Sequence, residues 1–344
     1  MSGVNALPDD LATALDELLD PIPAGRLAPV VDRLIREYRS GSSSSGGPGG
    51  SGGTAPPSSS ILRTADDAAA YAAYRMPATH AAVRDVLGRA AGRVPAPETH
   101  VDVGGGTGAA VWAAAEVWPA LRRCTVLEAA APVRTLGTRL AARATAPAVR
   151  AARWEAAQLG AQSELPEADL LTACYLLGEL SGADRDGLVD AAARSARVVA
   201  IVEPGTPAGY ARVLAARTRL LAAGMSVAAP CPHDGSCPVT GDDWCHFAAR
   251  VSRSSRHRTL KAASLGHEDE KFSYVVAVRS GGASPAPGRV VRHPRTRKGL
   301  VTLRVCDADG TLGDALVPRS RKELHRAARD AAWGDSWPPP GLAP

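Results

Sequence analysis

Apolar residues recur along this chain at two spacings that alternate with each other. Short apolar runs typical of buried strands are followed by longer segments in which an apolar residue recurs every three or four positions, as on one face of a helix. The strands predicted in this way span residues 99–103, 124–127, 149–153, 169–174 and 197–203. The helices predicted between and after them span residues 109–116, 132–144, 184–193 and 210–223. Strand–helix units joined by short loops indicate an α/β fold with a doubly wound sheet.

Helical spacing is also present upstream of this region, and strand-like runs follow downstream. Helices predicted over residues 7–19 and 27–38 form an N-terminal layer, and a helical region over residues 64–87 leads into the first strand. Residues 271–279 predict a strong strand, which we expect to be the antiparallel edge of the sheet. Residues 290–306 predict one or two short strands of a small β appendage.

A glycine-rich turn joins the first strand of the sheet to its helix. The glycines of this turn allow the backbone to approach a ligand where a Cβ would collide, and the free N–H groups of the next helix face the same space. A carboxylate that follows the second strand is placed to hold the two hydroxyl groups of an adenosine ribose. The candidate cofactor-binding residues are Asp102, Gly104, Gly106, Gly108, Glu128 and, at the end of the fifth strand, Glu203.

The form Asp-x-Gly-x-Gly-x-Gly over Asp102–Gly108 looks like the first motif of class I methyltransferases that use S-adenosylmethionine. In that family the acid helps to hold the amino group of the methionine moiety. Two other interpretations remain open at this point. The glycines are also compatible with a dinucleotide fingerprint for NAD or FAD, or with a turn that only lets a helix pack on the sheet.

Charge and length exclude some classes of protein. The net charge is +5 and arginine exceeds lysine, so nucleic acid is a permitted partner, although a bias in base composition also explains an arginine excess. The sequence contains no apolar run of membrane-spanning length and begins without the basic and apolar segments of a secretory signal. We therefore expect a cytoplasmic protein with no membrane partner. Its six cysteines suggest thiols or metal ligands rather than disulfides.

Three cysteines, Cys231, Cys237 and Cys245, lie in a turn-rich stretch that also contains His233 and His246. Turns of this kind can fold thiolates around an ion, but the spacing matches neither ordinary zinc fingers nor ferredoxins. The residues alone indicate a metal or cluster site that lacks one ligand. The fourth ligand is one of the two histidines or a distant cysteine. Of the distant cysteines, Cys306 is the best candidate because it lies outside the predicted sheet units.

Several motifs occur in an order that resembles one family. They are Ala72–Thr79, Asp102–Gly108, Val202–Pro207, Cys231–Asp234, Trp244–Phe247 and Glu268–Tyr274. Together they look like the methyltransferase-like proteins of small ribosomal subunit assembly, found in mitochondria and bacteria, over residues 64–319. The resemblance implies a [4Fe–4S] cluster held by four cysteines, which correspond here to Cys231, Cys237, Cys245 and Cys306. A zinc site with three cysteines and one histidine is the alternative.

With that resemblance the chain divides into five parts. These are an N-terminal helical segment (1–39), a flexible Ser/Gly/Pro linker (40–60), a class I S-adenosylmethionine methyltransferase-like domain with a cysteine insertion (61–280), a basic β appendage that completes the metal site (281–330) and a disordered tail (331–344). Two groups of basic residues lie near the cysteines and are candidates for contact with RNA phosphates. The first group is Arg250, Arg253, Arg256, His257, Arg258 and Lys261, and the second is Arg289, Arg292, His293, Arg295, Arg297 and Lys298.

Two functions remain in view. One is an S-adenosylmethionine-dependent methyltransferase acting on the rRNA of the small ribosomal subunit. The other is a non-catalytic assembly factor that keeps the methyltransferase fold to bind that rRNA. A redox enzyme that uses NAD at the glycine turn is a distant third. No general base can be assigned, because the segment after the fourth strand, Ala173–Glu179, lacks the Asn/Asp-Pro-Pro-aromatic motif of enzymes that methylate base amines.

Overall fold

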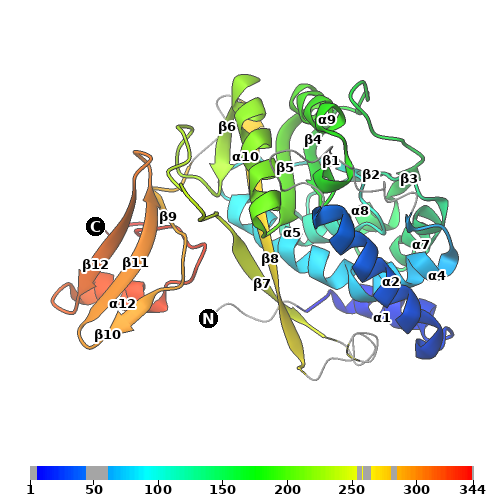
Figure 1. The fold of residues 1–344 in the computed structure, drawn as a ribbon, viewed down its shortest axis with the longest axis horizontal. Coiled ribbons are helices and arrows are strands. Elements are labelled where there is room, and N and C mark those ends of the chain that lie inside the picture. The colour runs from blue at the N-terminus through cyan, green and yellow to red at the C-terminus, as the bar shows by residue number, and fades with distance from the viewer. Residues whose placement is uncertain (1–5, 44–60, 254–257, 259–264, 280–284, 343–344) are drawn as a thin grey trace.

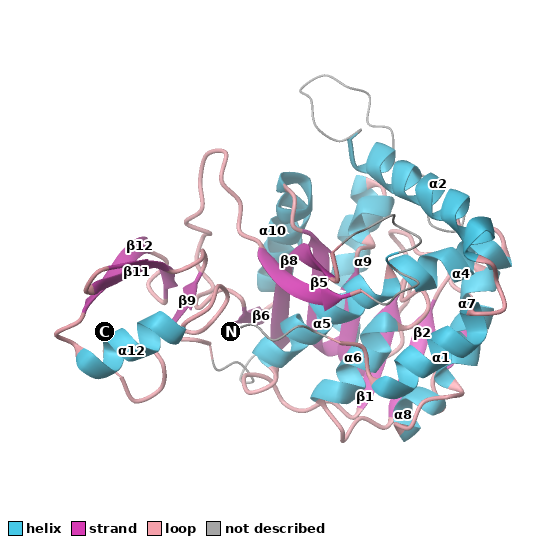
Figure 2. Cartoon of the chain, turned by 90° about the horizontal axis from the view of Figure 1, so that it is seen from below, coloured by secondary structure: helices cyan, strands magenta, loops and turns pink. Residues whose placement is uncertain are grey.

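The structure is a computed structural model that describes residues 6–43, 61–253, 258, 265–279 and 285–342 (Figure 1). Within these residues the chain forms a large α/β body and a small β appendage, which lie side by side in Figures 1 and 2.

The α/β body is built on one mixed sheet. Its strands are β1 (Thr99–Val103), β2 (Arg123–Leu127), β3 (Arg153–Glu155), β4 (Ala168–Cys174), β5 (Ala196–Pro204), β6 (Met225–Ala229), β7 (Phe247–Ser252) and β8 (His267–Arg279). They lie in the order β3-β2-β1-β4-β5-β8-β6, and β7 pairs with β8. The first five strands in this order, from β3 to β5, are parallel to one another, whereas β8 is antiparallel to β5 and β6. An antiparallel strand inserted next to the edge of a parallel sheet is the arrangement of class I methyltransferases, so the predicted fold class is confirmed.

Two details of the predicted sheet are wrong. Strand β8 is not the edge, because its apolar run is buried on both faces and β6 lies outside it. The short strand expected over residues 149–153 is instead the helical turn α8 (Pro147–Arg150) followed by β3.

Helices cover both faces of the sheet, as a doubly wound fold requires. One face packs against α4 (Ala65–Tyr74), α5 (Met76–Ala90), α6 (Ala109–Val117) and α7 (Ala131–Ala141). The other packs against α9 (Gly182–Ser195) and α10 (Pro207–Ala222). The short 3-10 helix η1 (Leu177–Glu179) follows β4 at the carboxyl edge of the sheet.

Two N-terminal helices, α1 (Asp9–Leu19) and α2 (Ala24–Ser43), pack on the outside of α4 and α7 (Figure 1). Each buries an apolar stripe in the same core as α4 to α7. The predicted linker begins inside α2, and residues 44–60 lie outside the described residues.

The appendage is a four-stranded antiparallel sheet with its own small core. It comprises β9 (Gly288–Val290), β10 (Arg295–Arg297), β11 (Leu300–Asp307), β12 (Leu312–Pro318) and α12 (Lys322–Asp330). The sequence predicted only one or two of these strands. Its core contains Leu303, Val305 and Leu324.

The segment after α12 is ordered where a disordered tail was expected. Trp337 is only 3% exposed in the core of the appendage. The ring of Trp333 lies edge-on to the rings of His246 and His293, at centroid distances of 4.8 and 4.9 Å. Over residues 331–342 the prediction of disorder is therefore wrong, because two tryptophans of this segment gain apolar contacts. No helix of the described residues has the length and apolar character needed to cross a membrane.

Candidate functional site

The glycine turn between β1 and α6 is a tight cradle at the carboxyl edge of the sheet. Gly104, Gly106 and Gly108 all have positive φ angles, of 64°, 58° and 92°. A Cβ on Gly105 would lie 2.3 Å from Asp102 Oδ2, which is too close for any side chain. The backbone therefore lies directly against the Asp102 carboxylate, and three of its positions adopt a conformation that favours glycine.

Asp102 is buried beneath this cradle with one free oxygen. Its Oδ1 accepts a hydrogen bond from the Thr172 hydroxyl at 2.6 Å, while its Oδ2 has no partner in the described structure. Burial raises the pKa of Asp102 to about 7, although the Thr172 hydrogen bond opposes this rise and the Glu128 charge adds to it. An orphaned acceptor under a glycine cradle fits the ammonium group of an S-adenosylmethionine, so the residues present suit that cofactor.

Glu128, at the end of β2, is engaged with the backbone around the turn. Its Oε2 accepts the Gly106 N–H at 3.0 Å and its Oε1 accepts the Ala130 N–H at 2.8 Å. Burial raises its pKa, and these two hydrogen bonds partly offset the rise. Glu128 lies beside the cradle as predicted, and each of its oxygens has a second lone pair that can accept a ribose hydroxyl.

Glu203, near the end of β5, is fully buried and engaged with other parts of the chain. Its Oε2 pairs with Arg212 Nε of α10 at 2.7 Å, and its Oε1 accepts the Leu177 N–H at 2.9 Å. Burial raises its pKa, against the effect of the Arg212 charge. Glu203 therefore fixes η1, whose neighbour Leu176 packs over Gly104.

Two aromatic residues at the cradle were missed by the sequence analysis. Trp154 Nε1 donates to Gly106 O at 3.0 Å, and its ring lies 2.8 Å from the position of a Cβ on Gly108. The Tyr71 ring of α4 lies 3.3 Å from the position of a Cβ on Gly106. The only sequence signal is their position, since Tyr71 directly precedes the motif Ala72–Thr79 and Trp154 directly follows the strand predicted over residues 149–153.

Three further side chains, those of Tyr175, Arg75 and Glu270, meet where the chain leaves β4. Tyr175 is the non-glycine residue with a positive φ, 58°, among the described residues. The Arg75 guanidinium lies 4.2 Å from its ring centroid and pairs with Glu270 of β8 at 3.0 Å. These groups form a charged and aromatic cluster where β4 ends.

The four predicted cysteines come together. Cys231, Cys237, Cys245 and Cys306 all line one cavity of about 40 Å³ between the α/β body and the appendage. Three come from the loops between β6 and β7, and Cys306 comes from β11. The other two cysteines, Cys124 and Cys174, do not line this cavity and lie on β2 and β4, where Cys124 is buried and Cys174 half-buried.

The environment of the thiols is apolar but bordered by cations. Burial and the neighbouring cysteines raise the pKa of Cys306 to about 12 and that of Cys245 well above its usual value. Arg217 of α10 donates to the carbonyls of His233 and Gly235, at 2.9 and 2.7 Å. Arg289 of β9 donates to Pro230 O at 2.9 Å and also lines the cavity. Two buried guanidinium groups thus border a place where thiolate charge would need compensation.

Neither histidine of the stretch lines the cavity. His233 Nε2 lies 3.5 Å from Cys306 Sγ, and the His246 ring stacks on Trp244 at a centroid distance of 5.2 Å. Among the described side chains no group of three or more His, Cys, Asp or Glu is placed to hold a metal ion. The four cysteines line the cavity without forming such a group.

The two basic groups have different environments. Arg250 and Arg253 pair with Asp269 and Glu268 across the β7–β8 hairpin, and Arg256, His257 and Lys261 lie outside the described residues. In the second group, Arg289 is 2% exposed and holds the backbone, so its assignment to a phosphate-binding surface is wrong.

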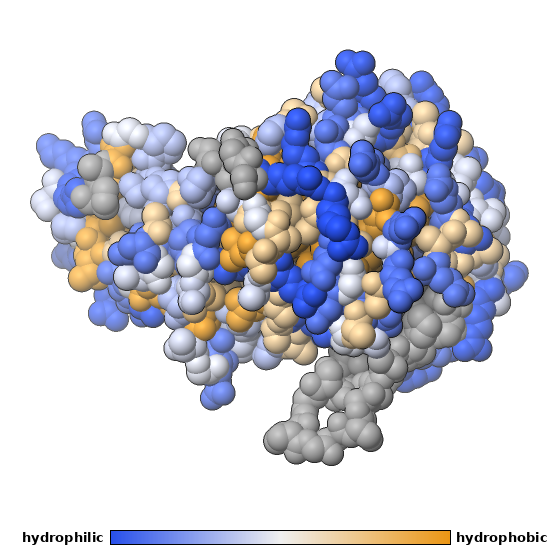
Figure 3. Space-filling view, turned by 90° about the horizontal axis from the view of Figure 1, so that it is seen from above, coloured by the Kyte–Doolittle hydropathy of each residue, from blue (hydrophilic) through white to orange (hydrophobic). Residues whose placement is uncertain are grey.

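The rest of the second group borders a groove. The groove, of about 360 Å³, lies between the cysteine loop and the appendage. Its charged and histidine lining residues are Asp243, Arg292, His293, Arg295, Arg304 and Asp314. Arg297 and Lys298 are exposed at the end of β10. Figure 3 shows hydrophilic residues over most of the upper face and apolar residues gathered near its middle.

Sequence comparison identifies the family. The family described as mitochondrial small ribosomal subunit Rsm22 matches residues 65–338. The chain belongs to the Rsm22 family. The match covers the sheet, the cysteine stretch and the appendage, so the resemblance inferred from the motifs is confirmed.

Curated relatives of this Rsm22-family chain carry names related to mitochondrial ribosomes. Human "Ribosome assembly protein METTL17, mitochondrial" is 28% identical over 293 residues, which are 78% of this chain and 62% of that protein. "Rsm22-cox11 tandem protein 2, mitochondrial" of Schizosaccharomyces pombe is 28% identical over 184 residues, which are 41% of this chain and 24% of that protein. The chain therefore spans less than two thirds of the length of these relatives.

Solved structures with a similar fold include methyltransferases. Magnesium protoporphyrin IX methyltransferase from Synechocystis, with bound SAH, has a TM-score of 0.38 and 15% identity, over 59% of this chain and 83% of that one. An O-methyltransferase family protein from Burkholderia thailandensis has a TM-score of 0.40 and 14% identity, over 63% of this chain and 60% of that one. The strand order and the family support the fold assignment.

Proposed function

We propose that this Rsm22-family protein binds S-adenosylmethionine and acts in the assembly of the small ribosomal subunit, where it methylates rRNA. The observation that carries the cofactor part is the orphaned Asp102 oxygen beneath the glycine cradle. The role in assembly of the small subunit is supported by the family and by the names of the relatives. The sequence predicts a cytoplasmic protein whereas those relatives are named as mitochondrial, and the proposal holds in either compartment because ribosomes are assembled in both.

In this proposal the cofactor is held by the predicted residues in three ways. Asp102 takes the ammonium group, Glu128 takes the ribose hydroxyls, and the turn over Gly104, Gly106 and Gly108 provides space for the cofactor backbone. Glu203 is a positioning residue that acts through Leu177 and η1. When bound, S-adenosylmethionine supplies an electrophilic methyl group.

A non-catalytic assembly factor is the second candidate, and a specific observation favours it. The backbone groups of Gly106 are satisfied by the chain itself, because Glu128 accepts its N–H and Trp154 donates to its carbonyl. A protein that keeps the fold only for rRNA binding needs no cofactor at the glycine turn, so hydrogen bonds within the chain can take the place of cofactor contacts there. The redox alternative loses ground, since the acid that precedes the glycines is typical of the methyltransferase motif.

We further propose that Cys231, Cys237, Cys245 and Cys306 hold one [4Fe–4S] cluster. A zinc ion needs four ligands at about 2.0–2.3 Å from a single point, whereas each iron of a cubane takes its own thiolate. Four thiols that surround a cavity suit the cluster better than zinc. The cluster would join the appendage to the α/β body, because Cys306 belongs to the appendage and the other three belong to the insertion.

The cofactor part is tested by calorimetric titration of the full chain with S-adenosylmethionine at pH 7.5. We expect the parent to bind and Gly106→Val to lose binding, because the valine would occupy the space at a position with positive φ. Gly88→Ala in α5 is the matched control, since a Cβ there meets nothing within 4 Å. Unchanged affinity in Gly106→Val would reject the assignment.

Enzyme and assembly factor are separated by a second measurement. Immature small subunits from cells that lack this protein are incubated with the chain and with S-adenosylmethionine labelled in its methyl group. Label in the rRNA supports methyl transfer, whereas stable association with the subunits and no label supports the non-catalytic factor.

A further inference from the structure

Three buried polar side chains form a continuous chain beneath the glycine cradle. His100 and Asp102 lie on the same face of β1, and Thr172 of β4 is the register partner of Asp102. The exposed fractions of the three side chains are 1%, 1% and 0%. The His100 Nε2 atom lies 2.7 Å from Thr172 Oγ1, which in turn lies 2.6 Å from Asp102 Oδ1.

The direction of the hydrogen bonds follows from the donors available. Thr172 has one hydroxyl proton, and this proton goes to Asp102. Thr172 must therefore accept from His100, so the neutral imidazole carries its proton on Nε2. Burial lowers the pKa of His100 to about 3, which keeps the ring neutral. Its Nδ1 has no partner in the described structure.

The far end of this chain is the free oxygen of Asp102. Asp102 Oδ2 is aimed at the cradle, since it lies 2.3 Å from the position of a Cβ on Gly105. The other titratable groups that influence this carboxyl or respond to it are Glu128 at the end of β2, the Cys124 thiol of β2 and the Cys174 thiol of β4. Burial raises the pKa of both thiols, so they stay neutral and only Glu128 adds charge.

We propose that His100 and Thr172 are positioning residues for the cofactor. They orient the Asp102 carboxylate so that Oδ1 is occupied and Oδ2 remains available for the ammonium group of S-adenosylmethionine. The inference rests on the proposed function and deepens it. Because the hydroxyl donates to the ionised form, its loss disfavours that form.

A pH dependence of cofactor binding follows. The pKa of Asp102 is raised to about 7, so the carboxyl is protonated and does not attract an ammonium group below that pH. Affinity should rise as the pH increases from 5.5 to 7.5. Removal of the Thr172 hydroxyl should move the midpoint of this rise upward.

The experiment is calorimetric titration of S-adenosylmethionine into the full chain across that pH range. Thr172→Val keeps the volume but removes the hydroxyl, and we expect about tenfold weaker binding at pH 6.5, the change produced when the pKa of Asp102 rises by about one unit. Thr172→Ser should restore the parent profile. His100→Leu removes the donor to Thr172 and should also move the midpoint upward, whereas His100→Gln keeps a donor near the position of Nε2 and should not.

The outcomes distinguish this inference from the proposed function. If the parent does not bind at pH 7.5, the cofactor assignment fails and the positioning role fails with it. If the parent binds but Thr172→Val has the parent midpoint, the positioning role is overturned while the cofactor assignment stands. Should Thr172→Val not fold, as judged by circular dichroism, an identical midpoint in His100→Leu and His100→Gln overturns it instead.

Discussion

At the scale of single residues, the main feature of this protein is a set of buried ionisable side chains. Their hydrogen-bond and charge partners compensate only part of the cost of burial. Asp102 keeps an unpaired oxygen, and the thiols of Cys245 and Cys306 have raised pKa values. Buried thiols with raised pKa values are protonated at neutral pH and inert, but metal binding deprotonates them. The two guanidinium groups beside the cavity, Arg217 and Arg289, are placed to stabilise the resulting negative charge.

Replacement of Cys306 tests the cluster at this scale. We expect Cys306→Ser to lose most of its iron and sulfide in anaerobically purified protein, because one of four thiolates is missing and the appendage is no longer tied to the insertion. Iron and sulfide analysis and visible absorption are the measurements. Cys124→Ala, at a buried cysteine outside the cavity, is the matched control and should keep the full content.

Two results would contradict this prediction. Full iron and sulfide in Cys306→Ser would place the fourth ligand elsewhere, with His233 or His246 next in line. One equivalent of zinc and no iron in the parent would exclude the cluster.

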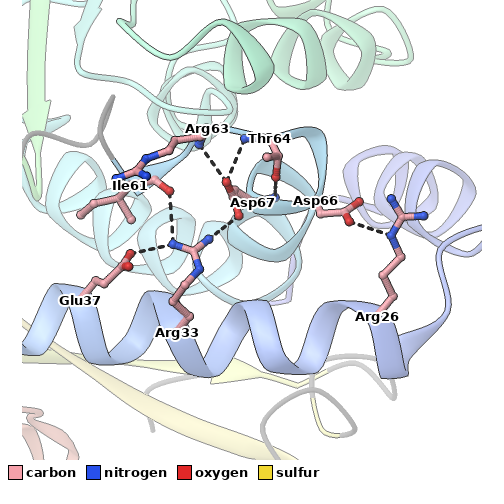
Figure 4. Close-up of polar contacts among 8 residues, drawn as sticks. All are labelled: Arg26, Arg33, Glu37, Ile61, Arg63, Thr64, Asp66 and Asp67. Carbon is pink, nitrogen blue, oxygen red and sulfur yellow. Dashed lines mark hydrogen bonds and ion pairs between the residues drawn. The ribbon is translucent and has the colours of Figure 1, made fainter.

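At the scale of elements, the N-terminal helices hold the helix that covers the cradle. Asp67, in the first turn of α4, accepts the N–H groups of Arg63 and Thr64 at 2.8 Å and forms an ion pair with Arg33 of α2 (Figure 4). Thr64 Oγ1 accepts the Asp67 N–H at 3.1 Å, which completes a capping box. One turn further along, α4 places Tyr71 against Gly106, so the α2–α4 contact fixes one wall of the candidate site.

Substitution of this cap should lower the stability of the protein. We expect Asp67→Asn to reduce the free energy of unfolding by about 1–2 kcal/mol, because a buried carboxylate that caps the helix and pairs with Arg33 is lost. Urea unfolding followed by tryptophan fluorescence measures the change. Asp66→Asn, which removes the partner of the exposed Arg26, is the control and should have little effect. Equal losses in the two variants would show that the cap is not the cause.

At the scale of the whole molecule, the cysteine cavity is the junction between the α/β body and the appendage. Arg289 links the two by donating to Pro230 O and to Gly334 O at 2.8 Å, and Arg93 of the body donates to Ser336 Oγ at 2.8 Å. Trp333 adds aromatic contacts with His246 and His293. These contacts join the appendage, with β10 and the arginine-lined groove, to the body, so the proposed rRNA surface would extend across both.

The salt dependence of RNA binding tests that surface. We expect the double variant Arg297→Ala, Lys298→Ala to lower the magnitude of the slope of log K against log salt by about two units, because each lost phosphate contact removes about one unit. Filter binding of purified small-subunit rRNA at several salt concentrations gives the slope. Arg197→Ala, at an exposed arginine where β5 begins, is the control. An unchanged slope in the double variant would show that Arg297 and Lys298 do not contact RNA phosphates.

Much of the candidate site was predictable because its signals are local. The glycine turn was expected where the first strand meets its helix, and Gly104, Gly106 and Gly108 lie there with positive φ angles. Their place after a strand and before a helix followed from periodicity. The engagement of Glu128 with the turn and of Glu203 with Arg212 was not predictable, since both depend on which backbone and side-chain groups approach from other elements.

By itself, the sequence determined the alternation of strands and helices and the place of the glycine turn with its acid, and it singled out four cysteines through the resemblance to the family. These features are set by neighbours in the chain, through side-chain periodicity and the φ angles that glycine permits. Only the tertiary structure decided that Cys306 shares a cavity with the insertion and that β8 lies inside the sheet. It also decided that Arg289 is buried, and that His100 and Thr172 support Asp102. Those outcomes depend on packing between segments far apart in the chain, where burial and hydrogen-bond partners are decided by the whole fold.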